Sequence, residues 1–112
     1  MSPSPTGTRR RGFGVVRIAG RSMEPTLRSG DLVLVRWGAA VRPGQLAVFA
    51  HPVEGVLVVK RVGFPDPDDA TRWWLERDNP GHGSDSWSFG SISREAILAR
   101  ALTRLPRRRT RE

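Results

Sequence analysis

The fold of this chain is constrained most by short apolar runs, rich in β-branched residues, that turn-forming residues separate. Each run is shorter than an average helix of about 11 residues. Ser-Gly-Asp at 29–31, Arg-Pro-Gly at 42–44 and Glu-Gly at 54–55 indicate turns between the runs. Strands are therefore predicted at residues 13–19, 32–37 (buried), 45–50, around Lys60 and at 71–77. We predict a mostly β fold, a small barrel or sandwich, with a short helical turn at residues 22–27.

The last apolar stretch, residues 93–105, is compatible with two structures. Several of its apolar side chains recur at helical spacing, and Ser93 is suited to cap a helix. The positions on this stripe are Ile97, Leu98, Ala101, Leu102 and Leu105. A terminal strand is equally open, and Pro106 ends the element in either case.

Two other segments are predicted to be loops. Residues 64–69 hold two prolines and three carboxylates, which favours an exposed loop over a strand interior. The three aspartates there lack the glycine and distal glutamate of an EF-hand, so no metal site is predicted. Residues 78–90 form a polar, glycine-rich segment that contains several side chains of catalytic type.

The positive charge of the chain is concentrated at its two ends. The formal net charge is +8, but residues 13–106 carry twelve basic and ten acidic side chains, a net charge of only +2. This predicts a disordered basic arm at residues 1–12, a folded domain at 13–106 and a basic tail at 107–112. The arginines of the ends can make peripheral contact with an anionic membrane face or stay solvated; no nucleic-acid partner is expected.

Composition excludes several classes of site and topology. The sequence has no cysteine, so it has no disulfide, no thiol chemistry and no cysteine-based metal site. No apolar run approaches the roughly 18 residues of a membrane span. The N-terminal residues lack the apolar region of a secretory signal. We therefore expect a cytoplasmic protein without a transmembrane anchor.

Ser22 is the first candidate functional residue. It lies between a predicted strand and a turn that contains Pro25, so its hydroxyl is expected where the backbone bends sharply. An ordinary helix N-cap, with Glu24 and Pro25 in the first turn, is one interpretation. A serine nucleophile is the other.

Lys60 is the second candidate, because it is the only lysine among 19 basic residues. Arginine does not lose its proton inside a protein, whereas a desolvated lysine can. Burial beneath Val58, Val59 and Val62 can lower the pKa of Lys60. A strand lysine that extends its amine into solvent remains the alternative. Ser22 and Lys60 together indicate a Ser-Lys dyad, in which neutral Lys60 activates the serine.

Three stretches resemble the signal peptidase I family of Ser-Lys proteases. They are G-x-S-M-x-P-T-L-x-x-G-D at residues 20–31, Val-Lys-Arg at 59–61 and D-N-P…D-S-x-x-F-G at 78–90. The start and the D-N-P segment are most similar to the small soluble nickel-type superoxide dismutase maturation proteases. The resemblance implies a β-rich fold in which residues 93–105 form a strand. It also implies removal of an N-terminal leader from a precursor protein, after small residues and without a cofactor.

The resemblance assigns a role to each matching residue. Ser22 is the nucleophile and also an oxyanion donor through its backbone N–H, and Lys60 is the general base. Met23 and Pro25 are implied in substrate binding. Support residues are Gly20, Ser84, Ser86 and Asp85, with a hydroxyl of Ser84 or Ser86 available to orient the amine.

Four positions depart from the family pattern. Arg77 replaces a glycine before Asp-Asn, and Trp87 replaces the arginine after Asp-Ser, which leaves Asp85 without its usual partner in sequence. Gly20 stands where some relatives carry a hydroxyl that helps hold the oxyanion. Gly83 stands where the family has the serine that orients the amine.

Three other functions are compatible with parts of the sequence. One is signal peptidase-like processing of exported proteins. A second is a LexA-like self-cleaving domain, which shares the chemistry but needs a cleavage site in its own chain. A third is a non-enzymatic basic binding module that uses the arginine-rich ends.

Overall fold

The computed structural model describes residues 10–106. The predicted basic tail at 107–112 and most of the predicted arm at 1–12 lie outside these residues. Within them, β1 begins at Gly12, next to the predicted domain boundary. No helix in the described part of the chain is long and apolar enough to cross a membrane.

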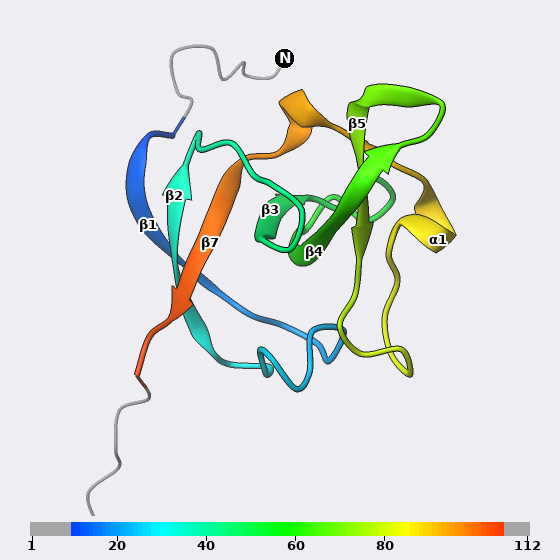
Figure 1. Ribbon diagram of the computed structural model, residues 1–112. Coiled ribbons are helices and arrows are strands. Elements are labelled where there is room, and N and C mark those ends of the chain that lie inside the picture. Colours follow the sequence, from blue (N-terminus) through cyan, green and yellow to red (C-terminus); the bar gives the residue numbers. More distant parts are fainter. Residues whose placement is uncertain (1–9, 107–112) are drawn as a thin grey trace, which may run out of the picture.

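The described residues form one antiparallel sheet of seven strands. Its strands are β1 (Gly12–Arg17), β2 (Leu32–Trp37), β3 (Leu46–Ala50), β4 (Leu57–Asp66), β5 (Asp69–Glu76), β6 (Ile92–Ser93) and β7 (Ala99–Arg104). Their order in the sheet is β1-β2-β7-β3-β4-β5-β6. Figure 1 shows that the sheet is strongly curled. Strands β1 and β6 are its two edge strands, and they do not pair with each other. The mostly β fold is confirmed, and the curled sheet stays open along one seam.

Two hydrophobic clusters hold the sheet together. One lies around Val33 and Val35 of β2 and includes Met23, next to Ser22. The other lies around Phe49 and Leu75. Strand β3 contributes to both clusters, Val48 to the first and Phe49 to the second, because neighbouring side chains of a strand point to opposite faces. The middle of the sheet is therefore buried on both faces.

Two predictions about individual segments were wrong. Residues 64–66 are not a loop, because β4 continues to Asp66 and the hairpin turns between Asp66 and Asp69. The pairing with β5 shifts register at Val62/Phe64 and again at Pro65/Asp66, and such irregularities accommodate a proline within a strand. Strand β2 is buried on one face only, since Leu32 is 39% exposed.

The last apolar stretch contains both a short helix and a strand. Ser93 caps the 3-10 helix η1 (Arg94–Ala96), with its hydroxyl accepting a hydrogen bond from the Ala96 N–H. The chain then forms β7, which pairs with β2 on one side and β3 on the other. The strand implied by the resemblance for residues 93–105 is confirmed at Ala99–Arg104, whereas Arg94–Ala96 is helical. One further helix, α1 (Ser86–Phe89), lies in the polar segment predicted to be a loop.

Candidate active site

Ser22 lies in the turn that follows β1. The Leu27 N–H donates to the Met23 carbonyl at 2.8 Å, which closes one helix-like turn. The Asn79 N–H donates to the Ser22 carbonyl at 2.8 Å, and the Asn79 side chain donates to the Arg21 carbonyl at 2.9 Å. Asn79 thus binds the carbonyl groups of both Arg21 and Ser22 and fixes the backbone there. The Ser22 hydroxyl contacts Lys60 instead of capping a helix.

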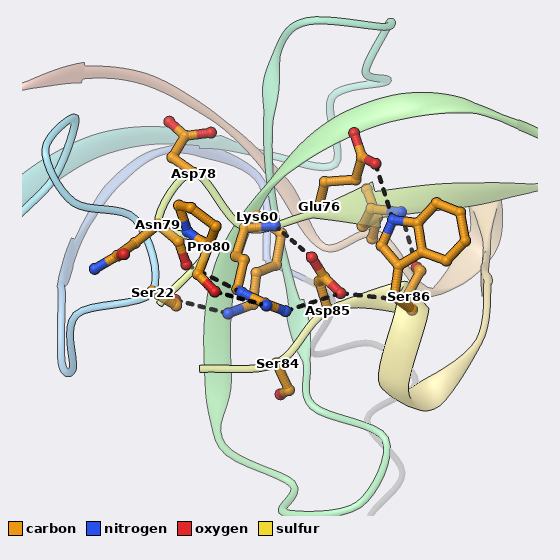
Figure 2. Close-up of polar contacts among 12 residues, drawn as sticks. Ser22, Lys60, Glu76, Asp78, Asn79, Pro80, Ser84, Asp85 and Ser86 are labelled. Atoms are coloured by element: carbon orange, nitrogen blue, oxygen red, sulfur yellow. Dashed lines mark hydrogen bonds and ion pairs between the residues drawn. The ribbon is translucent and has the colours of Figure 1, made fainter. Parts of the chain in front are cut away.

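Lys60 lies on β4 and is brought directly to Ser22. The distance from Lys60 Nζ to Ser22 Oγ is 2.7 Å, and Figure 2 shows the two side chains pointing toward each other. Only 3% of Lys60 is exposed, so it is not a lysine that extends into solvent. At this distance a neutral amine can take the hydroxyl proton directly.

Burial lowers the pKa of Lys60 below its ordinary value of 10.5. Three charges modify this effect: the carboxylate of Asp85 raises the pKa of Lys60, Arg77 lowers it and Glu54 raises it. The net effect is a lowered pKa, so the amine loses its proton more readily than an ordinary lysine, which is the direction that a general base needs.

The Lys60→Met variant is expected to gain stability at neutral pH. Because the pKa of Lys60 is lowered in the folded state, the unfolded chain binds more protons between that pKa and 10.5. The wild type therefore becomes more stable as pH rises through this window, and the variant does not. Its advantage in free energy of unfolding is greatest below the folded-state pKa, and its pH-dependent part is lost above 10.5. Denaturant titrations across this range measure it, and a pH-independent advantage would contradict the lowered pKa.

Neither predicted orienting hydroxyl contacts Lys60, because each has another partner. Ser84 Oγ lies 3.1 Å from His51 Nε2, and Figure 2 shows the Ser84 side chain pointing away from Lys60. Ser86 is buried, and its hydroxyl accepts a hydrogen bond from the Leu75 N–H at 2.8 Å. Both serines secure the 78–90 segment to the sheet.

His51 is a buried polar residue of the site region that sequence reasoning missed. Its Nδ1 accepts hydrogen bonds from the Val53 and Glu54 N–H groups at 3.1 Å each, so Nε2 carries the proton toward Ser84. The only sequence signal was the His-Pro step at the end of β3, which indicates the end of a strand and nothing about a partner 33 residues away.

Asp85 lacks the usual partner at position 87 but has another ionic partner, Arg77. Arg77 Nη1 lies 3.3 Å from Asp85 Oδ1, and the Arg77 N–H donates to Asp85 Oδ2 at 3.0 Å. Arg77 is the residue that departs from the family pattern before Asp-Asn. It supplies the positive charge that the pattern places at position 87. Asp85 also caps α1 by accepting from the Trp87 N–H.

Two glycines border Ser22. Gly20 has φ +84 with open space around it, a conformation that a hydroxyl-bearing residue rarely adopts. Gly83 also has φ +84, and a Cβ there would lie 2.4 Å from the Ser22 Cβ. The Ser22 N–H has no backbone acceptor among residues 10–106.

A small cavity of about 40 Å³ adjoins Ser22. It is lined mainly by apolar side chains from the end of β1, from β3 and from the start of β4, together with Met23. Met23 is thus at the site, 2% exposed, whereas Pro25 is exposed and does not line the cavity. Across the described residues, no group of three or more acidic or histidine side chains is arranged to hold a metal ion.

A family model described as Peptidase S24-like matches residues 2–101. No curated protein matches the chain. The family match supports the resemblance at the level of the general class, a serine peptidase of the LexA-like and signal peptidase I-like kind.

Proposed function

The chain belongs to the Peptidase S24-like family, and on that premise we propose that it is a serine endopeptidase in which Ser22 is the nucleophile and Lys60 the general base. The observation that carries this proposal is the 2.7 Å contact between a buried, solitary lysine and a serine hydroxyl beside an apolar cavity. A buried amine with a lowered pKa in a cleft is a recognised sign of a functional site.

The reaction follows from this geometry. Ser22 Oγ attacks the carbonyl carbon of the scissile peptide bond while the neutral Lys60 amine takes the hydroxyl proton. The Ser22 N–H donates to the oxyanion of the tetrahedral intermediate. The Lys60 ammonium then gives its proton to the leaving amine as the C–N bond breaks. Water hydrolyses the acyl-enzyme in the same way, with Lys60 again acting as the base.

The strands around the cavity provide two edges for an extended peptide. Within residues 10–106, strand β1 pairs only with β2, so no described strand covers its other edge. Strand β4 pairs with β5 only from Arg61 onward, so residues 57–60 have a strand on one side only. Both edges border the cavity, and a substrate strand that binds there can form main-chain hydrogen bonds. The small volume of the cavity favours short side chains before the cleaved bond.

The substrate that we propose is the N-terminal leader of a nickel superoxide dismutase precursor. This proposal is supported by the similarity of the Ser22 stretch and the D-N-P segment to the maturation proteases of that enzyme. Family membership also favours a second candidate, self-cleavage of LexA-like type, because the S24-like family includes self-cleaving domains.

Incubation of the purified chain with the unprocessed dismutase precursor tests the two candidates together. We expect mass spectrometry to show a precursor shortened by its leader and an intact protease, with no product from the Ser22→Ala variant. An intact precursor alongside a protease cut within its own chain would contradict leader processing and support self-cleavage. If the protease is folded and the masses of both the precursor and the protease stay unchanged, leader processing and self-cleavage are both contradicted.

A further inference from the structure

Arg77 organises the segment that follows β5. Its Nε donates to the Asn79 carbonyl and its Nη2 to the Pro80 carbonyl, each at 3.0 Å. Its Nη1 pairs with Asp85 at 3.3 Å. One guanidinium therefore holds the beginning and the end of the 79–85 loop, and its planar set of donors suits such a multiple contact.

This loop forms one wall of the candidate active site. Asn79 donates two hydrogen bonds to the backbone of Arg21 and Ser22. Gly83 lies directly against the Ser22 side chain. Any movement of the loop therefore moves the backbone and the immediate surroundings of Ser22.

The Arg77–Asp85 pair also determines the charge near Lys60. Asp85 is 3% exposed, and a buried carboxylate without a counter-ion would act strongly on a neighbouring amine. The charged groups that act on Lys60 are Asp85, Arg77 and Glu54. Arg77 thus neutralises the carboxylate that otherwise favours a protonated Lys60.

The Trp87 side chain does not pair with Asp85 and contacts other residues. Its indole N–H donates to Glu76 at 3.0 Å, and its ring meets Trp74 edge to face at 5.1 Å between centroids. The residue at position 87 thus has no part in the ion pair, and Arg77 alone supplies it among the described residues.

We propose that Arg77 is a positioning residue of the dyad: it fixes the loop behind Ser22 and neutralises Asp85, so that Lys60 remains the proton acceptor. This inference rests on the proposed peptidase function for its catalytic meaning. The effect of Arg77 on the protonation of Lys60 can be measured without a substrate.

The single lysine makes that measurement direct. Full-length protein grown with isotopically labelled lysine gives one side-chain Cε resonance, and its change with pH reports the pKa of Lys60. We expect this pKa to rise in Arg77→Met, to fall in Asp85→Asn and to return close to the wild-type value in the double variant. Asparagine can still cap α1 at position 85, and it gives up only the acceptor of the Arg77 N–H.

A bracing role alone does not predict opposite shifts in the two single variants. An unchanged Lys60 titration in both, or shifts of the same sign, would overturn the inference. If Arg77→Met does not fold, Arg77→Gln gives the same test, because it removes the positive charge and keeps a side-chain donor for the loop carbonyls.

Cleavage of a peptide spanning the leader junction separates this inference from the proposed function. Arg77→Met is expected to be several-fold slower at neutral pH and to recover at higher pH, as its Lys60 loses the proton. A wild-type pH profile in an active Arg77→Met enzyme would overturn the inference and leave the peptidase proposal intact. Opposite Lys60 shifts in a protein that cleaves nothing would support the charge balance and contradict the peptidase proposal.

Discussion

Replacing Lys60 with arginine is expected to abolish peptide cleavage, with a loss of roughly 10²-fold or more in rate. The substitution keeps the positive charge and a long side chain, but arginine does not become neutral in a protein. A residue that only needed charge would tolerate the change, whereas a residue that accepts a proton from Ser22 would not. Initial rates of leader-peptide cleavage, measured with matched amounts of folded protein, test this expectation.

Two variants control for the fold. Lys60→Met removes the amine while suiting a buried position, and Ser22→Ala removes the hydroxyl with little change in volume. Both are expected to fold and to be as inactive as Lys60→Arg. Cleavage by Lys60→Arg at the wild-type rate would show that no neutral amine is needed, and the dyad would have to be abandoned.

Much of the fold was accessible from sequence because local and tertiary preferences agree in most strands. The run at residues 32–37 has β-branched residues between turn signals, and β2 has those bounds. They disagree at Phe64 and Pro65, where a proline argues against a strand. There Phe64 stacks on Trp74 of the neighbouring strand, with ring centroids 6.0 Å apart, and the hairpin continues through the proline with a register shift.

The last apolar stretch was ambiguous for a related reason. Ala101 fits the helical stripe with Ile97, and it also alternates with Ala99 on the buried side of a strand. Periodicity in a short stretch cannot separate the two. The gap between β2 and β3 decides the matter, because a strand there satisfies the backbone groups of both neighbours.

The candidate site was accessible only where residue type itself carries information. A solitary lysine in an arginine-rich chain points to Lys60, and a serine before a Pro-containing turn points to Ser22. The roles of His51 and Arg77 depend on contacts that a loop creates. Arg77 reaches two carbonyls and a carboxylate within eight residues, a geometry that no period or spacing in the sequence indicates.

Gly83→Ala is expected to reduce cleavage by about 10²-fold or more, although residue 83 carries no reacting group. A Cβ at this position would lie 2.4 Å from the Ser22 Cβ and 3.5 Å from its Oγ. Either the loop or Ser22 must move, and misplacement of a reacting group by about 1 Å can cost roughly 10²-fold in rate. The left-handed backbone, φ +84, adds strain for any residue other than glycine.

Alanine substitutions at two other glycines separate the collision with Ser22 from the backbone strain. Gly44 has φ +88, but a Cβ added there would have no atom within 4 Å, so Gly44→Ala imposes the backbone strain without the collision. Gly81 lies in the same loop as Gly83 without a positive φ, and its Cβ would approach only the Asn79 side chain, at 3.5 Å. Both variants are expected to cleave the leader peptide at nearly the wild-type rate, with Gly44→Ala losing some thermal stability.

The Lys60 resonance shows whether the effect passes through the dyad. In Gly83→Ala we expect the lysine signal to change its chemical shift and its titration, because the Ser22 hydroxyl no longer lies 2.7 Å from Nζ. A fully active Gly83→Ala enzyme would mean that Ser22 and the loop can separate without harm to catalysis, and the close approach of Gly83 would then be a matter of packing alone.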